Sequence, residues 1–472
     1  MKKTEFEKWS NQATRWSTQY LNEIENYPVR AQTFPGEIAA QIPDSAPDEA
    51  ESMEQIMADF EHIIPPGMTH WQHPRFFAYF PSNAAPAAMI AEQLATSMAA
   101  QCMLWQTSPS ATELEQRMVD WLRQSVGLPE GFDGVLQDTA STATLCAILT
   151  MRERALNWEG NQKGLSGFPH LRVYASSRTH SSIDKAMWIA GLGQENLVKI
   201  DTDDEFAMDE DKLRAAIDAD IAAGHKPAGV VICVGGTSMG ATDRVRKVCK
   251  LAQEYQLFTH VDAAWAGSAM ICPEYRHLWD GIELADSIVL NPHKWLGASM
   301  ECSAHFIKDP ASLVRTMAIQ PEYLKTYGKD GIVNFSEWSV QLGRRFRALK
   351  VWFLLRAYGL NGLRTMIRNH VQWSEKLATL LDAEADFEIT TQPILSLFTF
   401  RYTPASVTDP VALDELNRNL VTAINDDGRI YLTQSVHDGV SVIRFMCGQF
   451  DMQESDIDVA YDVIREVARS LE

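Results

Sequence analysis

The stretch FTHVDAAWAGSAMICPEYRHLWDGIELADSIVLNPHKWLG, residues 258–297, holds the two segments that decide the fold. A short apolar run lies near each end of it and passes directly into polar residues, as a buried strand does at the edge of a sheet. Helical stretches such as residues 243–255 separate these runs from their neighbours. The same alternation continues along the chain, with strand-like runs at residues 171–175, 197–200, 229–234 and 304–307. It predicts an α/β fold, with a mostly parallel sheet covered by helices on both faces.

The chain is long enough for more than one domain, because its 472 residues exceed the size of a single compact core. The first 60 residues have a mostly polar helical pattern and are too short for a core of their own, so residues 1–85 are expected to form a helical segment that packs against something else. A large domain is predicted at residues 86–360. Residues 361–472 are expected to form a small α+β domain, with strand-like runs at residues 395–402, 429–432 and 440–445 and a helix at 410–424.

Composition excludes several classes of protein. The chain has 42 basic and 62 acidic residues and a net charge of −20, which disfavours binding to nucleic acid. The most apolar stretch, residues 84–105, is interrupted by Glu92, Gln93 and Gln101, so it predicts a buried helix rather than a membrane span. Seven cysteines without CxxC spacing are typical of reduced core thiols in a cytoplasmic protein, and no metal site is expected.

Two polar residues follow the apolar runs in the opening stretch. Lys294 follows the run at 287–290, and burial favours the neutral, nucleophilic amine that Schiff-base formation with an aldehyde requires. Asp262 ends the run at 257–261, where a carboxylate can keep a pyridine nitrogen protonated. Taken singly, Lys294 could end a strand in solvent and Asp262 could cap a helix. The pair is far more specific than either residue.

Two further segments have the same strand-end setting. Residues 137–143 (QDTASTA) lie between a strand-like run and a helix, where hydroxyls and free N–H groups suit a phosphate ester, although an ordinary helix cap has the same pattern. His180, in THSS after the run at 171–175, could stack on an aromatic cofactor or be a structural histidine. No GxGxxG or Walker pattern occurs, which argues against a dinucleotide or nucleoside triphosphate.

These motifs together resemble the group II pyridoxal-phosphate-dependent decarboxylases, and most closely their aromatic-L-amino-acid decarboxylase family. The resemblance runs from about residue 65 to the C-terminus, with the motifs in the family's order. It implies a fold type I enzyme, similar to aspartate aminotransferase, that acts as a homodimer with shared active sites and with the N-terminal segment packed on the partner subunit. The segments that carry the resemblance are HPRFFAYFP, SPSATELE, THSSIDKA, HVDAAWAGSA, NPHKW and LGRRFRALKVWF.

The resemblance also assigns roles to individual residues. Lys294 would form the internal aldimine with pyridoxal 5'-phosphate, and Asp262 would pair with its pyridine nitrogen. The ring would lie between His180 and Ala264. The remaining contacts to the cofactor and its phosphate would come from Ala140, Ser141, Thr237, Asn291 and His293. The substrate would meet Trp71, Tyr79, Phe80, Pro81, Ser82, His180, His293, Gly343 and, from the other subunit, Met103.

The product depends on what protonates the α-carbon after carbon dioxide leaves. In the family a loop tyrosine does so, and members with phenylalanine there are aldehyde synthases. Tyr323 matches that position, in a polar stretch before Gly328 that is typical of a lid. His180 also agrees with amine formation, since some aldehyde synthases have asparagine there. We therefore expect decarboxylation to an amine, with an aldehyde synthase or a non-catalytic binding protein as the alternatives.

The substrate class is less sharply defined. Gly343 matches members that accept bulky aromatic rings, because a missing side chain leaves room for an indole or catechol. Asp138 replaces the usual glycine of the phosphate turn, where it is expected to cap the helix. Met103 replaces a common aromatic residue, which predicts a softer pocket. Tryptophan, DOPA, tyrosine and phenylalanine remain open.

Overall fold

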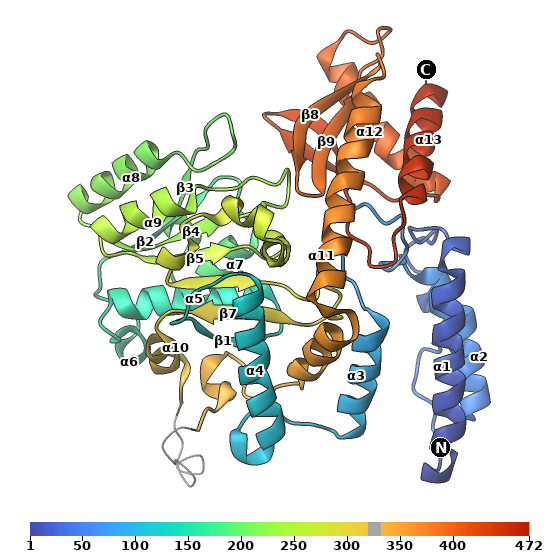
Figure 1. Ribbon diagram of the computed structural model, residues 1–472, viewed down its shortest axis with the longest axis horizontal. Coiled ribbons are helices and arrows are strands. Elements are labelled where there is room, and N and C mark those ends of the chain that lie inside the picture. The colour runs from blue at the N-terminus through green and yellow to red at the C-terminus, as the bar shows by residue number, and fades with distance from the viewer. Residues whose placement is uncertain (320–331, 472) are drawn as a thin grey trace. The chain divides into compact units, whose positions relative to one another are not determined.

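The computed structural model describes residues 1–319 and 332–471, which divide into two compact units (Figure 1). The larger unit comprises Ser82–Gln372. The smaller unit combines Met1–Pro81 with Trp373–Glu472, so the two ends of the chain fold together. The boundaries at residues 85 and 360 that the sequence suggested stay predictions.

The larger unit is built on a seven-stranded sheet in the order β1-β7-β6-β5-β4-β2-β3. Neighbouring strands from β3 to β6 pair in parallel, whereas β7 is antiparallel to both β6 and β1. Strand β1 therefore has the same direction as β6, and every strand except β7 ends at the same edge of the sheet. The strands are β1 (Asp133–Gln137), β2 (Leu171–Ser176), β3 (Leu197–Ile200), β4 (Lys226–Cys233), β5 (Phe258–Asp262), β6 (Ser287–Leu290) and β7 (Ser303–Ile307).

Helices cover both faces of this sheet, as the alternation in β2 shows. Val173 and Ala175 pack in the apolar core that includes residues of α5 and α7. Tyr174, which points to the other face, donates a hydrogen bond to Asp220 of α8 at 2.8 Å. The helices of this unit are α3 (Pro86–Ser97), α4 (Pro109–Ser125), α5 (Ala140–Ala155), α6 (Gly160–Lys163), α7 (Ser182–Ile189), α8 (Glu210–Ala222), α9 (Val245–Glu254), α10 (Pro310–Met317) and the first part of α11 (Arg347–Asp382).

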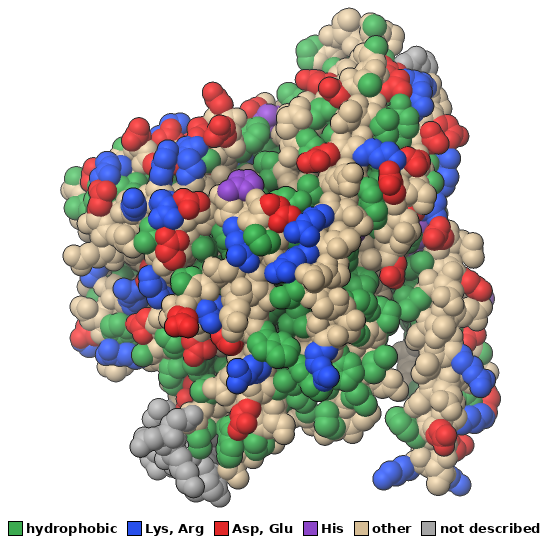
Figure 2. Space-filling model, viewed as in Figure 1, with side chains coloured by type: hydrophobic (Ala, Val, Ile, Leu, Met, Phe, Trp, Pro, Cys, Tyr) green, Lys and Arg blue, Asp and Glu red, His purple; other side chains and the backbone are tan. Residues whose placement is uncertain are grey.

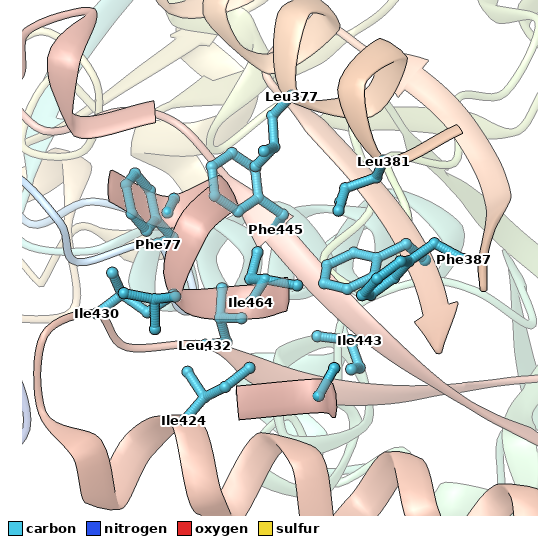
Figure 3. Packing of buried hydrophobic residues seen from close by; sticks show 14 of the residues in the cluster. Phe77, Leu377, Leu381, Phe387, Ile424, Ile430, Leu432, Ile443, Phe445 and Ile464 are labelled. Atoms are coloured by element: carbon cyan, nitrogen blue, oxygen red, sulfur yellow. The ribbon is translucent and has the colours of Figure 1, made fainter. Parts of the chain in front are cut away.

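The smaller unit has a four-stranded antiparallel sheet in the order β10-β11-β9-β8, with a core of apolar side chains from its strands and helices (Figure 3). Its helices α1 and α2 lie side by side, with the Trp16 and Phe60 rings 4.8 Å apart (Figure 1). Its strands and helices are α1 (Phe6–Glu23), α2 (Met53–Ile63), β8 (Phe387–Ile394), β9 (Leu397–Tyr402), α12 (Pro410–Asp427), β10 (Thr433–His437), β11 (Val440–Met446) and α13 (Ser455–Ser470).

One expected strand of this unit was wrong. Residues 429–432 form the connection to β10, which begins at Thr433. Ile430 and Leu432 nevertheless bury their side chains in the core, and Asn425 accepts a hydrogen bond from the Leu432 N–H at 3.0 Å. The apolar pattern thus marked core-facing residues of a loop, in which a side chain rather than a neighbouring strand accepts the backbone hydrogen bond of Leu432.

The surface charges and the buried cysteines agree with what the composition indicated. Figure 2 shows basic side chains interspersed with acidic ones on the visible face. All seven cysteines are buried and free. No helix among the described residues has the length and apolar character needed to cross a membrane.

Candidate active site

Residues singled out from the sequence gather at the edge of the large sheet where β1 and the parallel strands β2 to β6 end. The elements that carry these residues are adjacent in the fold although far apart in the chain, namely α5, β2, β4, β5 and β6. Ligands in such sheets bind at the carboxyl ends of strands. The residues carried at this edge are Ala140 and Ser141 after β1, His180 after β2, Thr237 after β4, Asp262 and Ala264 at the end of β5, and Asn291, His293 and Lys294 after β6.

Asp262 and Lys294 come from neighbouring strands. Asp262 pairs with Val289 of β6, and beyond the strands the Asn291 N–H donates to the Ala264 carbonyl at 3.0 Å. The Lys294 N–H donates back to the Asn291 carbonyl at 2.9 Å, so a tight turn follows β6. Asp262 is buried and accepts a hydrogen bond from the Ala264 N–H at 3.1 Å, while Lys294 is half-buried. A buried carboxylate and an amine on adjacent strand ends match the chemistry of a pyridine ring with an aldehyde.

The start of α5 suits a phosphate group. The side chain of the N-cap residue Thr139 accepts no hydrogen bond from the first turn of α5 within the described residues. The N–H groups of Ala140 and Ser141 can therefore donate to an anion. The buried Asn291 amide lies beside them in the fold, and Ser303 donates to its Oδ1 at 2.6 Å. The nitrogen end of that amide is therefore the end that can donate to a phosphate oxygen. These groups fit pyridoxal 5'-phosphate.

Asp138 does not cap α5, contrary to expectation, because Thr139 is the N-cap residue. The Asp138 carboxylate instead accepts hydrogen bonds from the Thr139 N–H at 2.5 Å and from Gln341 Nε2 at 2.9 Å. Ser339, two residues before Gln341, donates to the Gln137 side chain at 2.8 Å. Asp138 thus fixes the phosphate turn to a segment 203 positions later in the chain, which the sequence did not indicate.

His293 is a neutral donor in this arrangement. Burial, and then the nearby Lys294 charge, lowers the pKa of His293 to about 4. Its Nδ1 accepts a hydrogen bond from the Cys302 N–H at 2.9 Å, so the ring proton is assigned to Nε2. His180 is exposed, and its Nδ1 lies 2.8 Å from the Ser182 hydroxyl and accepts from the Ser182 N–H.

The residues expected around the substrate divide between the two units. Ser82, Met103 and Gly343 belong to the larger unit, and all three are at least partly exposed. In the smaller unit Trp71 and Tyr79 stack at 5.8 Å, and both rings are partly exposed. The other expected wall residues of that unit are Phe80 and Pro81. Tyr323 lies outside the described residues.

The space beside Gly343 is bounded by a residue that the sequence did not single out for that position. A Cβ at Gly343 would lie 3.2 Å from Gln101 Nε2. The Oε1 of Gln101 accepts a hydrogen bond from the Arg344 N–H at 2.8 Å, which holds the amide in place. Gln101 therefore takes part of the room that the missing side chain leaves.

The fold and the strand-end groups define the class of a pyridoxal-phosphate enzyme of fold type I, and comparison with known proteins defines the family. The family model described as the pyridoxal-dependent decarboxylase conserved domain matches residues 35–403. The chain therefore belongs to the pyridoxal-dependent decarboxylases. It is a carboxy-lyase like the aromatic-L-amino-acid decarboxylases, and its cofactor is pyridoxal 5'-phosphate.

Relatives with different products match the chain over almost its full length. It is 39% identical to tryptophan decarboxylase TDC2 of Camptotheca acuminata, over 99% of this chain and 95% of the relative. It is 37% identical to phenylacetaldehyde synthase of Petunia hybrida, over 98% and 94%. The crystal structure of Oryza sativa TDC with PLP and tryptamine superposes with a TM-score of 0.96, at 33% identity over 100% of this chain and 99% of that one. The family thus includes both decarboxylases and aldehyde synthases.

Proposed function

We propose that the protein decarboxylates an aromatic L-amino acid (tryptophan, DOPA, tyrosine or phenylalanine) to the corresponding amine and carbon dioxide. The observation that supports this most is the placement of Asp262 and Lys294 on neighbouring strand ends, with the uncapped start of α5 at the same edge. The bound cofactor supplies an electron-withdrawing pyridine ring that accepts the electron pair left by the departing carboxylate.

The protein residues hold that ring and the substrate. Lys294 would hold the aldehyde carbon, Asp262 would keep the proton on the pyridine nitrogen, and His180 and Ala264 would cover the two ring faces. Ala140, Ser141 and Asn291 hold the phosphate, with Thr237 nearby. His293, neutral near pH 7 because burial lowers its pKa to about 4, offers its Nε2–H as a hydrogen-bond donor without adding a charge.

The wall of the site selects an aromatic substrate and decides the product. By the family resemblance, Trp71, Tyr79, Phe80 and Pro81 would wall the substrate side, Ser82 would bind near the substrate carboxylate, and Gly343 would leave room for the ring. Tyr323 would supply the proton that the α-carbon needs once carbon dioxide has left, and the amine would leave when Lys294 takes back the aldehyde carbon.

The active form is a homodimer in which Met103 contributes to the site of the partner. An exposed apolar stripe on α3 supports a second copy of the chain as the partner. Ile90, Leu94 and Met98 follow one another at helical spacing and are 53%, 46% and 58% exposed. Exposed apolar side chains on one face of a helix are typical of an interface between subunits.

One assay tests the function. The purified protein is supplied with pyridoxal 5'-phosphate and each of the four aromatic amino acids in parallel, and amine, aldehyde and peroxide are measured together. We expect amine and carbon dioxide without peroxide. Aldehyde with equivalent peroxide and ammonia would instead make the protein an aldehyde synthase, the alternative that the Petunia relative supports.

A further inference from the structure

Three buried cations at three-residue spacing lie just before α11 and in its first turn, and none of them has a role in the site described above. They are Arg344, Arg347 and Lys350, whose side chains are 1%, 8% and 1% exposed. Each pairs with a carboxylate from a different part of the larger unit, namely Glu115 of α4, Glu301 before β7 and Glu92 of α3. Buried cations without a partner are costly, so this arrangement ties three segments to one helix end.

The pair between Arg344 and Glu115 is the most completely buried of the three. Arg344 donates to both carboxylate oxygens of Glu115, at 2.6 and 3.2 Å, in a two-point fork. The Arg344 side chain also lies over the Phe335 ring at 4.9 Å. This geometry leaves the pair little freedom to move.

The pair binds both backbone groups of Leu136, the residue before the end of β1. The Leu136 N–H donates to Glu115 Oε1 at 2.9 Å, and the Leu136 carbonyl accepts from Arg344 at 2.9 Å. Among the described residues, strand β1 is at the edge of the sheet and pairs with β7 alone. Glu115 and Arg344 therefore supply the acceptor and the donor that a further strand would have offered to this edge.

Leu136 leads directly into the phosphate turn. Gln137, Asp138 and Thr139 follow it, and α5 begins at Ala140. Arg347 strengthens the hold, since it also donates to the Leu136 carbonyl, at 3.5 Å. The position of Leu136 thus helps to determine the positions of the first N–H groups of α5.

We propose that Glu115 and Arg344 are positioning residues that hold the end of β1, and with it the start of α5, in the geometry that receives the cofactor phosphate. This inference rests on the proposed assignment of Ala140 and Ser141 to the phosphate. A pair that only stabilised the fold would act on every part of the cofactor site alike. A pair that acts through the phosphate turn acts on ligands that carry a phosphate.

Pyridoxal, which lacks the phosphate, separates these two roles. The full-length protein is freed of cofactor, and dissociation constants for pyridoxal 5'-phosphate and for pyridoxal are measured by fluorescence titration. In Glu115→Gln we expect the constant for pyridoxal 5'-phosphate to rise about tenfold or more, and that for pyridoxal to change by less than about twofold. Arg344→Lys keeps the charge but loses the two-point fork, so the same selective loss is expected if Glu115→Gln does not fold.

Glu153→Gln is the matched control. Glu153 is a fully buried carboxylate on α5 that pairs with Arg152 at 2.9 Å. It lies about 20 Å along the helix from Ala140. We expect this variant to lose thermal stability without a selective loss of affinity for pyridoxal 5'-phosphate.

Equal losses for both ligands in Glu115→Gln or Arg344→Lys, or no loss at all, would overturn the proposal. If the unaltered protein bound the two ligands equally well, the phosphate assignment itself would fail. Neither result depends on whether the product is an amine or an aldehyde.

Discussion

Removal of one buried hydroxyl, in Ser303→Ala, tests how the protein presents an amide to the cofactor phosphate. Ser303 is fully buried and donates to Asn291 Oδ1 at 2.6 Å. Without that donor, the Asn291 amide has to bury an unsatisfied carbonyl whenever its nitrogen faces the phosphate, at a cost of about 1–3 kcal/mol. If binding bears this cost, the dissociation constant for pyridoxal 5'-phosphate rises between about fivefold and 150-fold.

The assay is a titration of cofactor-free protein with pyridoxal 5'-phosphate, together with a thermal melt. Ser396→Ala is the matched control, because Ser396 is also fully buried and donates to the Cys447 carbonyl at 2.5 Å in the smaller unit. It is expected to lower the melting temperature and leave the dissociation constant unchanged. A dissociation constant within about twofold of the unaltered protein in Ser303→Ala would refute the role given to Asn291.

Three further predictions concern the product, the substrate and pH. Tyr323→Phe is expected to shift the product from amine to aldehyde with peroxide, because the proton donor is lost; an unchanged amine yield would show that another group donates. Gly343→Ser is expected to favour smaller rings, because the new side chain takes room beside Gln101, whose Nε2 would lie 3.2 Å from the Cβ; an unchanged substrate order in kcat/KM would contradict this. Burial lowers the pKa values of His293 and His305 to about 4 from 6.5, so the unfolded chain binds more protons between those values. The free energy of unfolding should fall as pH drops from about 6.5 to 4, by up to about 3 kcal/mol for each histidine, and denaturant melts at both pH values measure it. An equal free energy at both would show that the rings are not held neutral.

The sequence predicts the strand ends of the large sheet well, because each is a local pattern. A short apolar run that passes into Asp262, or into NPHK before Trp295, has a strong signal within about ten residues. Parallel strands end at one edge of a sheet, so the amino-acid sequence alone is enough to predict that the candidate cofactor residues lie together.

Polar partners from distant parts of the chain could not be predicted. Gln341 binds Asp138 across 203 positions, and Arg344 binds Glu115 across 229. No periodicity links such residues, because their pairing depends on how α11 meets β1. Gln101 beside Gly343 is a contact of the same kind, between residues that are equally remote in the chain.

Helix starts were also hard to place where two signals compete. Ser110 and Glu113 have the spacing of a capping box that would start the helix at Ala111, but α4 begins two residues earlier, at Pro109. Proline is favoured in the first turn because its φ is already helical. Glu113 is instead bound by Trp105 Nε1 at 3.0 Å. The capping-box motif therefore does not mark the start of this helix.

Borohydride reduction of the holoprotein, followed by peptide mapping, tests the central claim most directly. Reduction makes the bond between the cofactor and its lysine permanent, so the modified residue can be identified by mass. We expect a phosphopyridoxyl group on Lys294 alone. Modification of a different lysine, or of none, would contradict it.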